Sequence, residues 1–163
     1  PLTQEMRRTI SMASVLHDIG KMEIGEQVLN SPEPRTPEDE EIMRQHTLLG
    51  ARMLEELDAY RDEDFVRVAY QICRWHHERY DGSGYPDQLV GEQIPIAAQV
   101  VGLADAYETL TTGSGSQPPV PCAAAVQMLC TGEAGAFNPV LLDCLREIEN
   151  EIDDAMRRRP ETL

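Results

Sequence analysis

The sequence predicts an all-α fold, and two observations support this. Apolar residues recur at three- and four-residue spacing along most of the 163 residues, and no convincing stretch alternates apolar with polar residues as a half-exposed strand would. Two segments also open with a capping side chain followed by proline, a common start of a helix. Because a chain of this length can bury a core of its own, we expect one helical bundle over residues 1–163.

The first helix should run up to His17, and its apolar residues share one face. They are Met6, Ile10, Ala13 and Leu16. A second helix should begin at Thr36, with a hydroxyl cap, proline at the first position and acids in the first turn. One face of this helix is expected to be buried, and the residues along it are Ile42, His46, Leu49, Met53 and Leu57. The spacing therefore predicts that His46 is buried.

The third helix should open among the acids of 62–64. Its expected inner face comprises Phe65, Val68, Ala69 and Ile72, with His76 at the same spacing. After a glycine-rich turn, Ile94-Pro95 should begin another helix, in which Ala98, Val101 and Asp105 share a face. Asp105 thus stands where an apolar residue would be expected, which is unusual for a carboxylate.

The remaining chain should contain two more helices. Residues 113–119 are expected to form a polar surface loop, and Pro121 should begin a short helix with Val126 and Leu129 inside. Asn138-Pro139 should begin the last helix, whose apolar face is Leu141, Leu145, Ile148 and Ile152. The acidic stretch beyond Glu147 is interpreted as a solvated helix face.

Composition excludes several classes of protein. A formal net charge of −15 argues against binding of a nucleic acid polymer, which depends on lysine and arginine neutralising phosphates. The chain has no apolar run of membrane-spanning length and no signal peptide, so we expect a cytoplasmic protein. The cysteines form no CxxC pair and are expected to be free buried thiols: Cys73, Cys122, Cys130 and Cys144.

Chemistry is indicated by a set of polar residues on apolar faces. The set comprises His17, Asp18, His46, His76, His77 and Asp105. A single buried histidine is usually a hydrogen-bonded core residue, but six converging groups would be costly to desolvate without a cation. Nitrogen and oxygen ligands suit iron or manganese at least as well as zinc, and six ligands suggest two ions bridged by Asp18. Such a centre can activate water for attack on phosphorus.

The adjacent histidines need a special position on their helix. Neighbouring residues in a regular helix project about 100° apart, so His76 and His77 can reach one site only near a helix end. The segment that follows, with Asp81, Gly82 and Gly84, provides a turn, and Tyr85-Pro86 is expected to form a rigid, exposed tip.

These motifs resemble a known family. LHDIGK at 16–21 and HHERYDGSGYP at 76–86 closely resemble the HD-GYP domains, a branch of the HD metal-dependent phosphohydrolases. Further similar segments are VLNSP at 28–32, RQHTLLGARML at 44–54, PDQLVGEQIP at 86–95, ADAYETLTT at 104–112 and, more weakly, GAFNP at 135–139. The resemblance extends over about residues 11–145, and its combination of motifs is specific.

The resemblance implies an HD-domain-like helical bundle with a two- or three-metal centre that hydrolyses the bacterial messenger cyclic di-GMP to linear pGpG or GMP. By motif, His17 and Asp18 match the HD pair, His46 a third-helix ligand, His76 and His77 ligands of the second metal, and Asp105 a late ligand. Lys21 matches a lysine that contacts substrate phosphate, so Asp18 and Lys21 are the expected catalytic residues. Asp81, Gly82, Gly84, Tyr85 and Pro86 match the loop that shapes the site and touches partners.

The resemblance also implies a setting in bacterial signalling. We expect the chain to be the C-terminal output part of a larger protein with an upstream sensor or receiver domain, and GGDEF or PilZ-type domains are candidate partners. Members of the family carry a further ligand well upstream of HDIGK, and because the chain begins only sixteen residues before His17, we expect that ligand to be missing.

A second departure follows LTT at 110–112. Ser114 and Gln117 stand where the family usually has arginines that hold the substrate phosphate. Two alternatives to hydrolysis of cyclic di-GMP therefore stay open. One is a catalytically weakened module that binds a cyclic dinucleotide or a partner such as a diguanylate cyclase domain. The other is a nucleotide phosphohydrolase of the broader HD group, against which the GYP segment argues.

Overall fold

The computed structural model describes residues 2–31, 35–60, 63–114 and 117–157, and within these ranges it is helical without a strand. The all-α prediction is confirmed. The α-helices are α1 (Gln4–Ala13), α2 (Glu26–Leu29), α3 (Pro37–Arg44), α4 (His46–Glu55), α5 (Asp64–Trp75), α6 (Ile96–Thr112), α7 (Cys122–Thr131), α8 (Pro139–Glu147) and α9 (Glu149–Arg157). Four 3₁₀ turns join them: η1 (Ser14–Leu16), η2 (Ile19–Glu23), η3 (Asp58–Tyr60) and η4 (Gly91–Gln93). None of the described helices is long and apolar enough to span a membrane.

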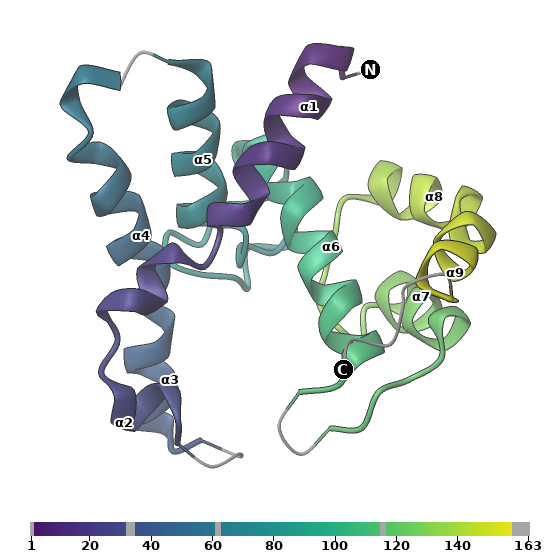
Figure 1. The fold of residues 1–163 in the computed structure, drawn as a ribbon. Coiled ribbons are helices and arrows are strands. Elements are labelled where there is room, and N and C mark those ends of the chain that lie inside the picture. The colour runs from purple at the N-terminus through teal and green to yellow at the C-terminus, as the bar shows by residue number, and fades with distance from the viewer. Residues whose placement is uncertain (1, 32–34, 61–62, 115–116, 158–163) are drawn as a thin grey trace.

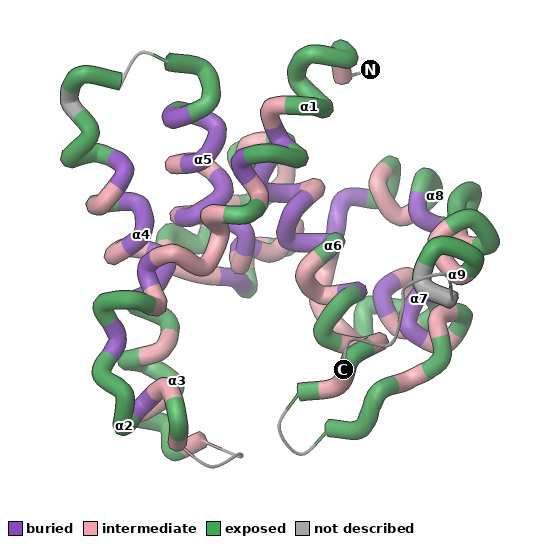
Figure 2. Tube along the Cα trace, in the orientation of Figure 1, coloured by how far each residue is buried: buried purple, intermediate pink, exposed green. Residues whose placement is uncertain are grey.

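The first core is formed where α1, α4 and α6 pack around α5 (Figure 1). Its buried residues are Ile10, Ala13, Leu54, Val68, Ala69, Ile72, Cys73, Ala97 and Val101. The expected faces of the first and third helices are thus largely confirmed, although Met6 and Phe65 are each 37% exposed. Glu63 occupies the N-cap position of α5 without a side-chain hydrogen bond, and Asp62 lies outside the described residues. Buried residues recur along α5 toward the centre of the molecule, between exposed and half-buried ones (Figure 2).

The segment after Thr36 corrects one prediction. Thr36 accepts a hydrogen bond from the backbone N–H of Asp39 and proline follows it, so the helix start is confirmed. However, α3 ends at Arg44 and α4 begins at His46, so the expected continuous face is wrong. The chain turns at Gln45 and α3 packs beside α2 (Figure 1), which leaves Ile42 43% exposed. His46 is nevertheless buried, as predicted.

A second core joins the end of α6 to α7, α8 and α9. Leu103, Tyr107, Ala125, Val126, Leu129, Phe137 and Leu145 form it. The starts after Pro121 and at Asn138 are confirmed, and the Asn138 side chain accepts from the N–H of Val140. The expected single last helix is wrong, because it breaks at Ile148, which is 43% exposed, before α9 packs back on α7. The acidic face of α9 is solvated in part, since Glu151 and Asp154 are exposed while Glu149 and Asp153 are half-buried.

Two smaller expectations concern cysteines and a loop. All four thiols are free, but only Cys73 is buried and Cys144 is exposed, because α8 turns one side to solvent. The loop after α6 is confirmed in its described part, where Ser114 and Gln117 are exposed and pair through their backbones. Residues 115–116, like Pro32 and the chain beyond residue 157, lie outside the described part.

Candidate metal centre

The six candidate ligands come from four separate segments. His17 and Asp18 lie between the turns η1 and η2, His46 is the first residue of α4, and His76 and His77 directly follow α5. Asp105 lies on α6. The end of α5 therefore lies among the other ligand segments, because α1, α4 and α6 all pack against α5.

The structure brings the six side chains into one connected group. One potential ligand atom from each of Asp18, His46, His76 and His77 lies within 4.8 Å of the others. Asp18 Oδ1 is 3.3 Å from His46 Nε2 and 3.9 Å from His76 Nε2, while Asp18 Oδ2 is 3.3 Å from His17 Nε2. His17 Nε2 in turn lies 3.7 Å from Asp105 Oδ1. Asp18 thus faces histidines with both of its oxygens.

The hydrogen bonds of the imidazole rings determine which nitrogens face the centre. The Nδ1 atoms of His17, His46 and His76 lie 2.8, 2.6 and 2.9 Å from the carbonyl oxygens of Ser14, Met43 and Ile72. A carbonyl oxygen only accepts, so each of these Nδ1 atoms carries the proton. Burial keeps the rings of His46 and His76 neutral, so each of these two presents the lone pair of its Nε2.

The Nε2 lone pairs of His46 and His76 face each other with no proton between them. His46 Nε2 and His76 Nε2 are 3.5 Å apart, and Asp18 Oδ1 beside them is buried without a hydrogen-bond partner. Acceptors that converge without a donor repel one another, and in a buried position water cannot compensate them. A divalent cation satisfies all of them at once, so the donor set fits a metal centre of nitrogen and oxygen ligands.

The protonation states agree with this arrangement. Burial lowers the pKa of His46, and it lowers that of His76 to about 3, so both rings are neutral at pH 7. Burial, with repulsion from His76, also lowers the pKa of His77. Burial alone would raise the pKa of Asp18, but hydrogen bonds from His17 and Lys21 hold it well below its usual range. Ionised oxygen and neutral nitrogen are the forms that bind metals.

The two adjacent histidines meet because α5 ends just before them. His76 occupies the C-cap position, and the ring centroids of His76 and His77 are 4.0 Å apart. This confirms the expectation that relaxed geometry lets both rings face the same centre. His77 then stacks on Tyr85, with centroids 4.8 Å apart and planes 23° from parallel. The expected exposed tip is therefore wrong, since Tyr85 is half-buried against the histidine.

Glu78, which the sequence analysis did not single out, fixes this loop. Its side chain is buried, and its two carboxylate oxygens accept hydrogen bonds from the N–H groups of Asp87 at 2.7 Å and Leu89 at 3.0 Å. The N–H of Tyr85 donates to the carbonyl of His77. The loop is thus tied to the end of α5 at Tyr85 and again at Asp87 and Leu89. No local pattern marks such a residue, because its partners lie nine and eleven positions away.

Comparison with known proteins agrees with the geometry. The HD domain family matches residues 1–140. The chain belongs to the HD-domain family. It is also 34–37% identical, over most of its length, to proteins named cyclic di-GMP phosphodiesterases, which confirms the resemblance to the HD-GYP branch. HD-domain phosphohydrolases depend on metals, as the donor set requires.

Three relatives illustrate the similarity. The chain is 34% identical to a "Cyclic di-GMP phosphodiesterase" of Thermotoga maritima over 91% of this chain and 39% of that protein. It is 37% identical to the "Cyclic di-GMP phosphodiesterase response regulator RpfG" of Xanthomonas campestris, over 88% of this chain and 37% of that one. It is 31% identical to the "3'3'-cGAMP-specific phosphodiesterase 2" of Vibrio cholerae, over 85% and 26%. The chain thus spans well under half the length of these relatives.

Two glycines let the ligand segments of this HD domain approach closely. A Cβ on Gly20 would lie 2.0 Å from the carbonyl oxygen of His46, and one on Gly102 would lie 2.2 Å from that of His76. Any larger residue would force the backbones apart. Gly20 therefore allows η2 to lie against α4, and Gly102 allows α6 to lie against the end of α5.

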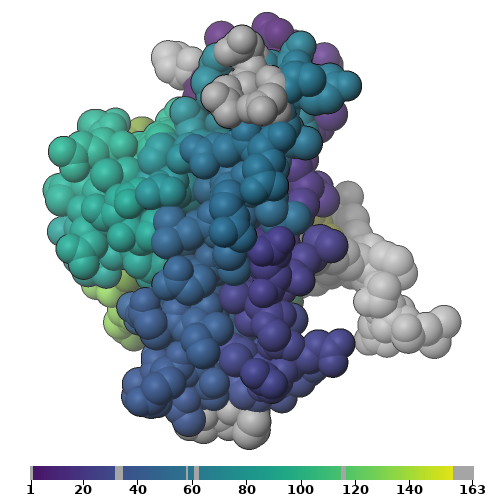
Figure 3. Space-filling model, turned by 90° about the vertical axis from the view of Figure 1, so that its left-hand side faces the viewer, coloured from purple at the N-terminus to yellow at the C-terminus, as the bar shows by residue number. Residues whose placement is uncertain are grey.

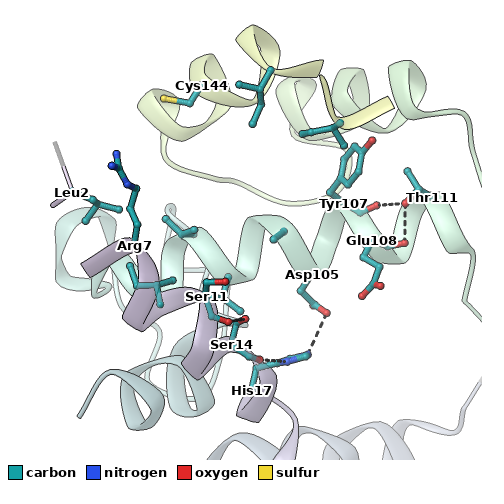
Figure 4. A pocket seen from close by; sticks show the side chains of 16 residues that line it. Leu2, Arg7, Ser11, Ser14, His17, Asp105, Tyr107, Glu108, Thr111 and Cys144 are labelled. Atoms are coloured by element: carbon teal, nitrogen blue, oxygen red, sulfur yellow. Dashed lines mark hydrogen bonds and ion pairs between the residues drawn. The ribbon is translucent and has the colours of Figure 1, made fainter. Parts of the chain in front are cut away.

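A groove of about 770 Å³ reaches the HD-domain centre from one side. His17 and Asp105 lie at one end of it, and Leu2, Arg7 and Cys144 lie at the other (Figure 4). Its walls come from α1, α6, α8 and α9 and are mostly apolar. The expectation about the additional upstream ligand stays a prediction.

Proposed function

We propose that the protein is a metal-dependent phosphodiesterase that hydrolyses cyclic di-GMP to linear pGpG or GMP. The observation that carries the proposal is the convergence of donor-free lone pairs from His46, His76 and Asp18. The printed names of similar proteins support the substrate class. Because the chain spans only part of those proteins, activity and substrate are proposals for this chain.

The same proposal assigns the ligands. His46, His76 and His77 would hold one divalent cation with Asp18 Oδ1, while His17, Asp105 and Asp18 Oδ2 would hold a second. The division follows from the two oxygens of Asp18, which face different histidines. Iron and manganese are the proposed metals, since no thiolate belongs to the group. Bound there, the cations would supply an acidified water and would stabilise negative charge on the phosphodiester.

The chain's own groups would position the reactants. Lys21 Nζ lies 2.5 Å from Asp18 Oδ2 and its side chain is 41% exposed, so it can reach a phosphate oxygen while it remains beside the centre. His17 Nε2 faces both Asp18 and Asp105, which orients its ring. Asp18 and Lys21 are therefore the proposed catalytic pair.

The loop 81–86 would have two roles. Gly84 and Tyr85 pack inward, while Asp81 and Ser83 are exposed. Gly82 adopts a positive φ of 82°, which turns the chain there. We propose that the inward part shapes the site, and that the exposed part is available to a GGDEF or PilZ-type domain. An upstream sensor or receiver domain stays a prediction.

The test is hydrolysis by purified protein loaded with iron or manganese under anaerobic conditions. Cyclic di-GMP should be converted to a linear product identified by mass spectrometry, and the His17→Ala/Asp18→Ala double variant should be inactive. Parallel assays with cyclic GMP-AMP and with nucleoside monophosphates test the substrate class. If calorimetry shows tight binding of cyclic di-GMP and no metal supports turnover, the protein is a binding module instead.

A further inference from the structure

Three side chains form a continuous stack at the edge of the candidate centre. His77 is one of the clustered histidines, Tyr85 stacks on its ring, and the Arg44 guanidinium carbon lies 5.1 Å from the centroid of the Tyr85 ring. The arginine and the tyrosine are 41 positions apart in sequence. They meet because α3 and α4 (blue) lie against the teal segment that follows α5 (Figure 3).

The backbone around Arg44 is fixed by the centre itself. The carbonyl of Met43 accepts from Nδ1 of His46, and the carbonyl of Arg44 accepts from the Thr47 hydroxyl at 2.9 Å. The break at Gln45 thus places Arg44 at the end of α3, directly before a candidate metal ligand. These hydrogen bonds hold the backbone of Arg44 in place beside the candidate centre.

The charge on Arg44 is available to a ligand. Lys21 is paired with Asp18, and the guanidinium of Arg79 lies over Phe137 and donates to the carbonyls of His76 and Glu78. Arg44 is exposed, and within the described ranges it contacts no carboxylate. Among the described residues, Arg44 thus lies close to the candidate ligands without a paired carboxylate, in a chain with a net charge of −15. Its ring contact leaves the five N–H donors free for an anion.

We propose that Arg44 binds a phosphate of the cyclic dinucleotide substrate other than the one held at the metal centre, and that Tyr85 positions it. The inference rests on the proposed function. A cyclic dinucleotide carries two phosphodiesters, and a centre that binds one leaves the second in a strongly acidic protein. A guanidinium held on an aromatic face is pre-ordered for such an anion, since less side-chain entropy is lost on binding.

The test compares Arg44→Gln and Arg44→Lys with Arg52→Gln, which removes an exposed arginine paired with Glu23. Loss of a charge-assisted contact should raise KM for cyclic di-GMP by about 10- to 100-fold, with a smaller change in kcat. Arg44→Lys should recover part of the loss. The kcat/KM for cyclic di-GMP should fall more than that for bis(p-nitrophenyl) phosphate, which has a single phosphate. An unchanged KM in Arg44→Gln overturns the inference.

A double-mutant cycle tests the role of Tyr85. If Tyr85 acts by holding Arg44, Tyr85→Leu and Arg44→Gln should have non-additive effects on KM, and additive effects would contradict that part. Calorimetry with cyclic di-GMP separates this inference from the proposed function. Should wild type bind the nucleotide without hydrolysing it, the proposed function fails, while weaker binding by Arg44→Gln still supports the inference. Should wild type not bind it at all, both fail.

Discussion

His46 Nε2 and His76 Nε2 lie 3.5 Å apart, although each ring directs its Nδ1 to a backbone carbonyl. Two nitrogen lone pairs therefore face each other in the interior, beside an unpaired oxygen of Asp18. This is an unfavourable arrangement for a metal-free core and a favourable one for a core that binds a cation.

Cation binding should stabilise the fold. Adding Mn²⁺ at about 100 times its Kd should increase the free energy of unfolding by about 2.7 kcal/mol, because only the folded state holds the assembled ligands. Asp18→Asn removes the ionised oxygen that faces His46 and His76 and should abolish most of the increase in Tm. Asp64→Asn, on the exposed start of α5, is the matched control and should keep it. An equal increase in both variants would argue against this centre.

The metal-free protein should lose stability as the pH falls below 6.5. Burial lowers the pKa of His76 from 6.5 to about 3, so the unfolded chain takes up a proton in this window that the folded chain does not. One such group changes the free energy of unfolding by up to about 1.4 kcal/mol per pH unit.

His17 acts in the opposite direction, because its hydrogen bond to Asp18 raises its pKa. The contribution of His76 is therefore measured as the difference between wild type and His76→Gln in thermal unfolding at pH 7, 6 and 5 with a chelator present. The variant should show the shallower loss of Tm. Parallel curves would contradict the assigned neutral state.

Glu78→Gln should destabilise the protein by about 2 kcal/mol. The amide keeps one acceptor oxygen but places an NH₂ group against a backbone N–H of Asp87 or Leu89. Because the loop then loosens beside His77, turnover should fall as well. Urea unfolding measures the first effect, and Glu92→Gln on the exposed η4 turn is the control. If Glu78→Gln loses no more stability than Glu92→Gln, Glu78 does not fix the loop.

Gly102→Ala should separate α6 from the end of α5. The new methyl group would overlap the carbonyl oxygen of His76, and overpacking of this kind costs about 1–3 kcal/mol. Cation affinity should also decrease, since Asp105 moves with α6. Gly25→Ala meets nothing closer than 3.8 Å and should be tolerated. Titration of Mn²⁺ by calorimetry distinguishes the two variants.

The sequence indicates which polar side chains converge better than it indicates where the helices end. His46 and His76 were found because they continue an apolar spacing that the packed helices retain. The breaks at Gln45 and Ile148 were missed, since neither position carries glycine or proline and both breaks depend on tertiary packing. The stack of Arg44 on Tyr85 was missed for a related reason: it depends on where a loop folds back, which residue spacing does not contain.

The most direct test of the central claim is anomalous X-ray diffraction from crystals soaked in Mn²⁺, measured at the absorption edge of the metal. The account predicts a peak among Asp18, His46, His76 and His77, within about 2.3 Å of the facing oxygen and Nε2 atoms. A second peak is expected between His17 and Asp105. Crystals that hold manganese only elsewhere, with the Nε2 atoms of His46 and His76 hydrogen-bonded to protein groups, would contradict it.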